Sequence, residues 1–227
     1  MAHVLVLLAH PDLPHSRANR LMAEAAQGAQ AAEDAADAAD IEQAGRPGQT
    51  VQVRDLARLY PDFDIDVPAE QAQLARADLV VWQHPTHWYG MPALMKQWVD
   101  EVLTFGWAYG PGGTALRGKD LWLATTTGGP ESAYRPDGYN RYFFDAFLPP
   151  YEQTAALCGM RFLPPLVLHG AQAAGDAELQ AHARLYADRL ARYPDWPEMA
   201  DLPACPACSV PSADRPADDP SGRRGRA

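Results

Sequence analysis

The 227-residue sequence has little cysteine, no excess of basic residues and no long apolar run. Its three cysteines are too few for a disulfide framework and are typical of a protein from a reducing compartment. Lys and Arg total 19 against 29 Asp and Glu, and the net charge of -10 disfavours nucleic acid and anionic lipid as main partners. No segment approaches the roughly 20 apolar residues of a membrane span, and the first residues lack the features of a signal peptide. We therefore expect a cytoplasmic protein.

The chain is long enough for one domain of ordinary size, and its apolar residues predict alternating strands and helices. Strands are predicted at 3–9, 50–56, 79–83, 121–126 and 163–170, and helices at 17–29, 69–76, 92–104, 140–158 and 176–192. This alternation indicates an α/β fold with a doubly wound parallel sheet and helices on both faces. Four strands are continuous apolar runs and should be buried on both faces, whereas 50–56 alternates and should lie nearer an edge.

Two segments fall outside this pattern. Residues 29–50 are rich in Ala and acidic residues, and we interpret them as an exposed insertion that can extend the first helix. The segment 203–227 is rich in Pro, Ser and charged residues, so we expect a disordered tail after a domain spanning residues 1–200. The tail holds a Cys-Pro-Ala-Cys motif at 205–208, but without a strand–helix context or a second cysteine pair this motif does not indicate a redox or zinc site.

Three unusual junctions follow predicted strands, and in an open parallel sheet such junctions converge on one rim where ligands bind. The first, at 9–19, contains His10, Ser16, Arg17 and Asn19. Ser16 is a suitable helix N-cap, and the amide groups that follow a cap can bind phosphate. Two interpretations fit: a phosphate site, or Ser16 as a helix cap only with His10 as a turn residue.

The second junction, at 84–91, contains four large side chains, namely His84, His87, Trp88 and Tyr89, with Pro85 near its start and Pro92 just after its end. The prolines restrict both ends of the loop, so its rings are held on a fixed support on which they can border a flat ring system. The alternative is that Trp88 and Tyr89 pack into the core. A zinc site formed by the two histidines is disfavoured, because no further ligand stands at suitable spacing, and we expect no metal.

The third junction, at 125–134, has the sequence TTTGGPESAY. Its two glycines, Gly128 and Gly129, allow close approach of the main chain to a ligand, and Thr126 and Thr127 offer hydroxyl groups. At the end of this junction, Tyr134 is either a proton donor or a lid residue.

A glycine-rich segment at 105–120, between the third helix and the fourth strand, contains Trp107 and Tyr109. Aromatic residues on a mobile loop suit a lid over a stacked planar substrate. They equally suit a subunit contact, and the two roles are compatible if the site lies at a dimer boundary.

Five segments taken together make the sequence similar to the flavodoxin-like NAD(P)H:quinone oxidoreductases, and most of all to the ancillary oxidoreductases of glutathione-regulated potassium-efflux systems. They are AHP...HSRAN, LYPDFDID, RADLVVWQHPTHWYGMPALMKQWVDEVL, GWAYGPGGTALRGK and TTTGG, within about residues 3–193. The resemblance implies a five-stranded sheet of order 2-1-3-4-5 and a homodimer with a flavin at each interface. It favours FMN over FAD as the flavin, with NAD(P)H as co-substrate and a quinone as acceptor.

The resemblance also implies roles for individual residues. The residues expected to bind the flavin phosphate and ribityl chain are His10, Ser16, Arg17, Ala18 and Asn19. Those expected to line the flavin ring are Thr86, His87, Trp88 and Tyr89 at its edge and Thr126, Thr127, Gly128 and Gly129 beside its pyrimidine end. Tyr134 matches an active-site tyrosine of related quinone reductases, and Tyr109 matches an aromatic residue contributed across the dimer interface. His87 and Tyr134 are the expected proton sources.

The residues and the family resemblance together predict one function and leave two alternatives. We expect an NAD(P)H dehydrogenase (quinone), in which a flavin takes hydride from NAD(P)H and two electrons pass to a quinone or related electrophile. The first alternative is a regulatory ancillary subunit of a potassium/proton antiporter, peripheral on the inner face of the cell membrane, with secondary enzymatic activity. The second is a flavodoxin-type electron carrier, which the aromatic loop and the lack of a tight Thr/Ser-Gly-Thr phosphate loop disfavour.

Overall fold

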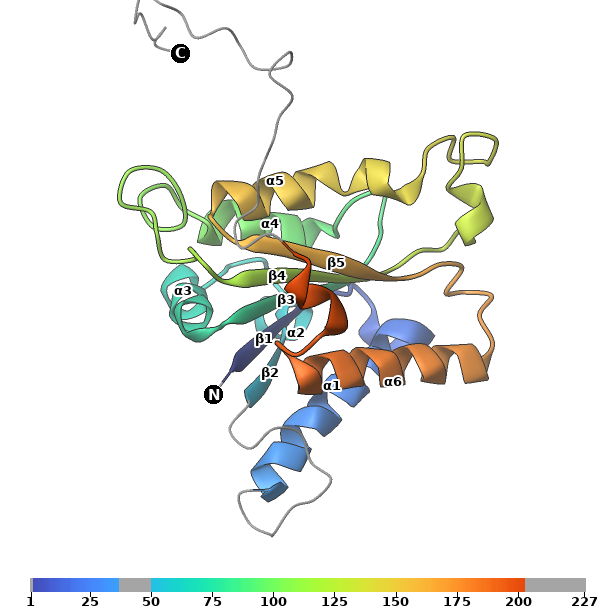
Figure 1. The fold of residues 1–227 in the computed structure, drawn as a ribbon, viewed down its shortest axis with the longest axis horizontal. Coiled ribbons are helices and arrows are strands. Elements are labelled where there is room, and N and C mark those ends of the chain that lie inside the picture. Colours follow the sequence, from blue (N-terminus) through green and yellow to red (C-terminus); the bar gives the residue numbers. More distant parts are fainter. Residues whose placement is uncertain (1, 37–49, 203–227) are drawn as a thin grey trace, which may run out of the picture.

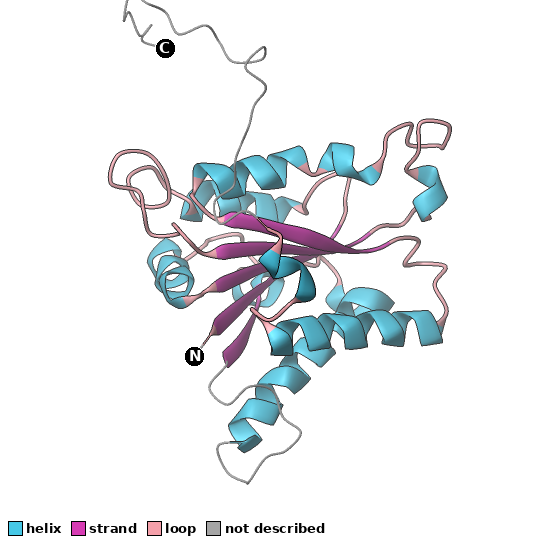
Figure 2. Ribbon diagram, in the orientation of Figure 1, coloured by secondary structure: helices cyan, strands magenta, loops and turns pink. Residues whose placement is uncertain are grey.

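A computed structural model describes residues 2–36 and 50–202, in which five parallel strands form one sheet with helices on both faces (Figure 1, Figure 2). The strands are β1 (His3–Leu8), β2 (Thr50–Asp55), β3 (Leu79–Pro85), β4 (Asp120–Thr126) and β5 (Arg161–Leu168). The α-helices are α1 (Arg17–Ala36), α2 (Leu56–Leu59), α3 (Val67–Arg76), α4 (Ala93–Val102), α5 (Pro149–Leu157) and α6 (Asp176–Arg192). The order β2-β1-β3-β4-β5 confirms the predicted doubly wound α/β sheet.

The central strands are buried because helices cover both faces of the sheet, toward which successive side chains alternate. Every residue of β3 and of β4 is buried, as their apolar runs predict. On one face the sheet packs against α3, α4 and α5, which contribute Trp98 and Tyr151 to the core. On the other face α1 and α6 contribute Met22 and Tyr186, and Trp122 of β4 stacks on Tyr186. The sheet is therefore a rigid support for the loops at its ends.

The prediction that the fifth strand is buried on both faces is wrong. β5 lies at an edge of the sheet, and only its residues Leu163 and Leu168 are buried. Pro164 and Pro165 account for this position, because proline cannot donate a ladder hydrogen bond and is found at edges and bulges. The pairing of β5 with β4 shifts register at this point. β2, predicted to lie nearer an edge, is the opposite edge strand.

The helix predicted over 140–158 is shorter than expected. Within this range only α5 is α-helical, and a 3-10 turn at Phe144–Phe147 precedes it. Proline occupies the first two positions of α5, where it is tolerated but where it favours a helix start. Arg141 has a φ of 62°, which no α-helix contains. The segment before α5 is consequently a loop at the rim of the sheet (Figure 1).

The first helix runs beyond its predicted end and reaches Ala36, in agreement with the helical extension considered for the acidic insertion. The rest of that insertion, 37–49, and the tail 203–227 with its Cys-Pro-Ala-Cys motif lie outside the described residues. Within 2–36 and 50–202, no helix has both the length and the apolar character needed to cross a bilayer.

A buried ion pair joins β2, α3 and α4. The fully buried Glu70 carboxylate accepts hydrogen bonds from the Arg54 guanidinium at 3.0 Å, the Tyr60 hydroxyl at 2.5 Å and the Trp98 indole N–H at 3.0 Å. Burial and the neighbouring carboxylate raise the pKa of Tyr60 to about 12, so its hydroxyl stays a donor. Each group of the cluster is compensated only while all of them are present.

Replacement of Glu70 by alanine is expected to lower the free energy of unfolding by about 3 to 5 kcal/mol, because Arg54 then remains in the interior without its counter-ion. Urea denaturation measures the change. The matched control is Asp100→Asn, which breaks the exposed Lys96–Asp100 pair of α4 and should change the free energy of unfolding by less than about 1 kcal/mol. Equal losses in the two variants would contradict the stabilising role of the buried pair.

Candidate functional site

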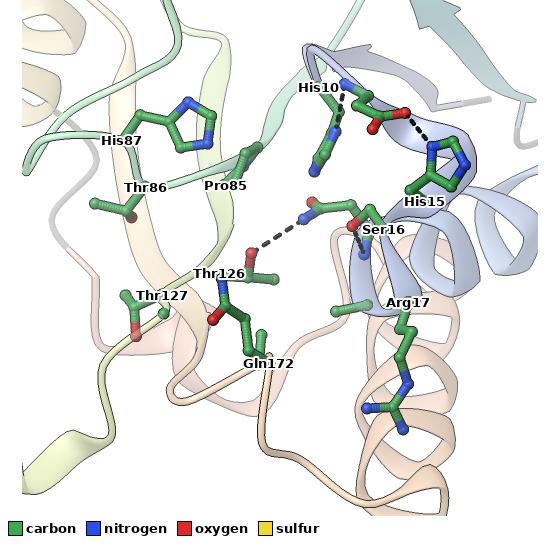
Figure 3. Close-up of a pocket in the computed structure, with 15 residues that line it drawn as sticks. His10, His15, Ser16, Arg17, Pro85, Thr86, His87, Thr126, Thr127 and Gln172 are labelled. Atoms are coloured by element: carbon green, nitrogen blue, oxygen red, sulfur yellow. Dashed lines mark hydrogen bonds and ion pairs between the residues drawn. The ribbon is translucent and has the colours of Figure 1, made fainter.

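The loops after β1, β3, β4 and β5 meet at the carboxyl rim of the sheet and enclose a polar pocket of about 470 Å³ (Figure 3). Its lining residues are His10, Asp12, His15, Ser16, Arg17, Ala18, Asn19, Pro85, Thr86, His87, Thr126, Thr127, Gly128, Ala171 and Gln172. The three junctions identified in the sequence therefore contribute to one pocket, as the rule for carboxyl ends of parallel strands predicts.

The start of α1 forms one wall of this polar pocket. Ser16 caps the helix, because its hydroxyl oxygen accepts a hydrogen bond from the main-chain N–H of Asn19 at 3.2 Å. The other amides of the first turn have no partner within the helix, and the positive end of the helix dipole lies behind them. Arg17 lines the pocket, but its guanidinium pairs with Asp176 of α6 at 2.6 Å and is turned away from the centre (Figure 3).

His10 presents a neutral hydrogen-bond donor to the polar pocket. The Asp12 backbone N–H donates to His10 Nδ1 at 3.0 Å, so the proton of the neutral ring lies on Nε2. Burial and the nearby His87 lower the pKa of His10, and the neutral ring therefore predominates at neutral pH. The other edge of the His10 ring points into the pocket, where Nε2–H can meet a ligand oxygen (Figure 3).

Asn19 contributes a buried acceptor that the protein leaves unpaired. Its Nδ2 donates to Thr126 Oγ1 at 3.0 Å, and its main-chain carbonyl accepts from Gln83 Nε2 at 3.0 Å. Its Oδ1 is buried and has no hydrogen-bond partner among the described residues. Because a buried acceptor without a partner is unfavourable, a ligand hydroxyl is its natural complement.

The loop after β3 contains a tight turn that directs aromatic rings outward. The backbones of His87 and Gly90 exchange two hydrogen bonds, at 2.9 and 3.0 Å, and the residues between them, Trp88 and Tyr89, have φ of 47° and 66°. Positive φ costs about 1 to 3 kcal/mol for such residues, and a turn that only connects would favour Asn or Gly. Trp88 is 95% exposed, which overturns the alternative that it packs into the core.

A second, aromatic pocket of about 600 Å³ adjoins the polar pocket and shares Thr86 with it. Its lining residues are Thr86, Trp88, Tyr89, Gly129, Pro130, Ser132, Ala133, Tyr134, Tyr139 and Asn140. Tyr89 stacks on Phe147 with ring centroids 5.0 Å apart, and the largely buried Tyr134 contacts Phe147 edge-on. Burial raises the pKa of Tyr134, and a hydrogen bond with the Thr127 side chain opposes that rise. The Tyr134 hydroxyl is therefore protonated at neutral pH.

Gly128 and Gly129 connect the two pockets, with Gly128 lining the polar pocket and Gly129 the aromatic one. A Cβ added to Gly128 would meet no atom within 4 Å. The missing side chain therefore leaves open space in the pocket, and a flat ligand can approach the main chain there.

Some residues of the polar pocket were not identified in the sequence, namely Asp12, His15, Ala171 and Gln172. The last two belong to the loop after β5, which has neither a paired glycine nor an aromatic cluster. Its position after a strand was the available signal, because the rule that places the other three loops at the rim applies to it too.

Trp107 and Tyr109 line neither of these two pockets. They belong to the segment between α4 and β4, which lies at the amino end of the sheet and away from the carboxyl rim (Figure 1). Both pack against the core cluster that contains Trp98. They are therefore not a lid over the pockets of their own chain. Their alternative role in a subunit contact stays a prediction.

Residues 2–190 match a family model described as a flavodoxin-like fold. The chain belongs to this flavodoxin-like family. It is 46% identical over 195 residues to the glutathione-regulated potassium-efflux system ancillary protein KefF of Klebsiella aerogenes, which covers 86% of this chain and 97% of that protein. The resemblance inferred from the sequence motifs is thereby confirmed.

Solved structures of other proteins also resemble this chain. General stress protein 14 of Treponema denticola, in complex with FMN, superposes with a TM-score of 0.70 at 35% identity and covers 84% of this chain and 98% of its own. A Klebsiella pneumoniae protein described provisionally as a quinone reductase superposes with a TM-score of 0.67 at 26% identity and covers 84% of each chain.

His84, near the end of β3, is fully buried below the carboxyl rim of the sheet. Its ring stacks on Tyr151 with centroids 5.8 Å apart, Nδ1 donates to the Pro85 carbonyl at 3.0 Å, and Nε2 has no partner in the described part of the chain. Burial lowers the pKa of His84 from 6.5 to about 4. Between these values the unfolded chain binds a proton that the folded chain does not.

The stability that neutral His84 contributes is present above a pH of about 6.5 and is lost as the pH falls toward about 4. His84→Phe keeps the stacked ring and removes the titration. The wild type should therefore lose about 3 kcal/mol more unfolding free energy than this variant across that pH range. Chemical denaturation at both ends of the range measures the difference, and parallel pH profiles of the two proteins would refute it.

Proposed function

We propose that this protein is a flavin-dependent NAD(P)H oxidoreductase that reduces quinones or related electrophiles by two-electron hydride transfer. The observation that carries the proposal is the pairing of a polar pocket at a helix N-terminus with an adjoining aromatic pocket. FMN has the same division, with a phosphate and hydroxylated chain at one end and a planar ring at the other. The FMN complex of the Treponema denticola protein and the provisional assignment of the Klebsiella pneumoniae protein support the cofactor and the reaction.

The residues present fit FMN. The first turn of α1 and His10 Nε2–H would hold the phosphate, with Asn19 Oδ1 accepting from a ribityl hydroxyl. The open space at Gly128 would leave room for the ring, and the 87–90 turn would border its edge. When bound, the flavin supplies the capacity to take hydride from NAD(P)H and pass it on. FAD is the second candidate, and the mass of the released cofactor distinguishes the two.

Tyr134 and His87, the two expected proton sources, occupy different places. Tyr134 lines the aromatic pocket and is protonated at neutral pH, whereas His87 is exposed and lines the polar pocket. A quinone oxygen seated among the aromatic rings would therefore meet the Tyr134 hydroxyl before it meets His87. We assign the proton donation to Tyr134 and a contact with the cofactor to His87.

Exposed aromatic side chains on the loops that border the aromatic pocket support the predicted homodimer. They are Trp88, Tyr89, Tyr139, Tyr142 and Phe143. Exposed apolar surface gathered around a site is typical of an interaction surface. In such a dimer Tyr109, which lies away from the pockets of its own chain, would serve its partner's site.

The purified protein is expected to be yellow, to lose its flavin colour with NAD(P)H and to regain it with a quinone.

Gly128→Val should weaken FMN binding by at least about tenfold, since the valine side chain fills pocket space, while thermal stability stays near the wild-type value. Fluorescence titration of the apoprotein with FMN measures this. The control Gly28→Ala, also without an atom within 4 Å of the added Cβ, lies on the exposed side of α1 and should bind FMN normally. A protein that takes up neither FMN nor FAD would overturn the proposal.

The 46% identity to KefF supports a second function, that of an ancillary subunit on the cytoplasmic side of a potassium-efflux antiporter. Vesicles that contain the antiporter are expected to release potassium faster when this protein is added. Unchanged efflux would exclude the role. Gly128→Val separates the two functions, because efflux stimulated by this variant without FMN would mean that regulation does not need the redox reaction.

A further inference from the structure

His169, the first residue after β5, touches the walls of both pockets although it lines neither of them. Its partly buried ring has its centroid 5.2 Å from that of Tyr134 and 5.2 Å from that of Phe144. Its Nδ1 lies 3.1 Å from Thr127 Oγ1. A titratable ring from a loop without a recognised motif thus connects the Thr-Gly-Gly turn to the aromatic pocket.

The direction of the hydrogen bond between His169 and Thr127 follows from the available hydrogens. The Thr127 hydroxyl donates its single hydrogen to the Gly129 carbonyl at 2.8 Å. Thr127 Oγ1 therefore accepts from His169, and the proton of the neutral imidazole lies on Nδ1. The Thr127 side chain also lowers the pKa of Tyr134, so its presence favours the phenolate. Thr127 Oγ1 thus accepts from His169 and donates to the Gly129 carbonyl.

This network has a second arrangement that it can adopt without losing a partner. If Tyr134 gives up its proton, the Thr127 hydrogen can rotate from the Gly129 carbonyl to the Tyr134 phenolate. The Gly129 carbonyl stays paired, because the Gly170 N–H donates to it at 2.8 Å. Thr127 Oγ1 keeps the Nδ1–H of His169, so no buried polar atom of the network becomes an orphan.

We propose that His169 is a positioning residue for proton transfer from Tyr134 and acts through Thr127. Its Nδ1–H holds Thr127 Oγ1 where the Thr127 hydroxyl can stabilise the phenolate that forms when the Tyr134 O–H bond breaks and the acceptor's O–H bond forms. The electron pair reaches the quinone as hydride that derives from NAD(P)H, and Tyr134 recovers its proton from solvent. The inference rests on the proposed function, which it extends by one residue.

The surroundings of His169 favour its neutral form. Burial lowers its pKa, and the Glu131 carboxylate opposes that change. Glu131 and Tyr134 are the titratable groups that these contacts place near the ring. Because Phe144 packs edge-on against the same ring, the test must separate hydrogen bonding from packing.

Two substitutions of His169 make this separation. His169→Phe keeps an aromatic ring against Tyr134 and Phe144 but removes the Nδ1–H, whereas His169→Asn restores an N–H donor near the same place. Rapid-mixing experiments on the FMN-loaded enzyme measure how fast quinone oxidises the reduced flavin. This rate should fall by about tenfold in His169→Phe and recover in His169→Asn. FMN content, KM for quinone and the rate of reduction by NAD(P)H should stay unchanged in both variants.

Combination with Tyr134→Phe tests whether His169 acts through Tyr134. The double variant of His169→Phe and Tyr134→Phe should be no slower than Tyr134→Phe alone, because the group that His169 assists is already missing. The proposal would be overturned if quinone oxidised the reduced flavin of His169→Phe at the wild-type rate. A His169→Asn enzyme as slow as His169→Phe would also overturn it, since packing would then be the cause.

A second readout does not depend on turnover. NMR titration of protein with labelled tyrosine reports the pKa of Tyr134, whose signal among the nine tyrosines is assigned by its loss in Tyr134→Phe. The pKa of Tyr134 should rise by about one unit in His169→Phe and stay near the wild-type value in His169→Asn. An unchanged pKa in His169→Phe would overturn the role of His169. A wild type that binds flavin but shows no quinone turnover would instead refute the proposed function, and the titration would still decide whether His169 stabilises the phenolate.

Discussion

The pairing of five parallel strands is the constraint on which the site depends, because it brings the carboxyl end of every strand to one rim. The hydrogen bonds between neighbouring strands continue into the residues that follow them. The Thr86 N–H donates to the Thr126 carbonyl at 2.7 Å, and the Thr127 N–H donates to the Leu168 carbonyl at 2.9 Å. The first residues of the loops are therefore placed by the same ladder that holds the sheet together. Groups distant in the sequence need no long loops to meet, and their relative positions are as rigid as the core below them.

Local backbone strain is concentrated at this rim. In the described part of the chain, the non-glycine residues with positive φ are Phe63, Trp88, Tyr89 and Arg141. Trp88 and Tyr89 border the aromatic pocket, and Phe63 lines a further cavity of about 450 Å³ beside His10 and His87. The stacking of Tyr89 on Phe147 offsets only part of the cost, since an aromatic pair contributes about 0.5 to 1.5 kcal/mol. A turn that places large rings at unfavourable φ and leaves Trp88 in solvent makes physical sense if those rings contact a ligand or a second subunit.

The buried part of the fold could be predicted from the sequence because burial leaves a periodic pattern. The runs at β3 and β4 are unbroken, and the amphipathic segment of α6 has the predicted bounds 176–192. The pattern failed where apolar residues do not enter the core. Phe143 is exposed although its neighbours resemble a helix, and β5 is apolar although it is an edge strand. Edge position depends on which strands pair, and no local run of residues encodes that choice.

The site was predictable to the same degree. Junctions with glycine pairs or aromatic clusters could be recognised, and the topology then placed them together. His169 could not be recognised, because its importance lies in the hydrogen bond to Thr127 and in ring contacts that only the folded chain creates. The position of Trp107 and Tyr109 at the amino end of the sheet was equally hidden in their composition. A glycine-rich aromatic loop has the same composition at either end of a sheet, and only its place between a helix and the next strand assigns it to the amino end.

Two features shape the electrostatics of the polar pocket, namely the neutral form of His10 and the pairing of Arg17 with Asp176. The chain carries a net charge of -10, which opposes the approach of an anion. Arg17 is paired with Asp176, and burial keeps His10 neutral, so a phosphate held at this rim would be bound chiefly by N–H dipoles. Such donors act over short distances and require correct geometry, whereas free lysines would attract any anion and would be screened by salt. An acidic protein can in this way hold one phosphorylated cofactor tightly without attracting other anions to the rest of its surface.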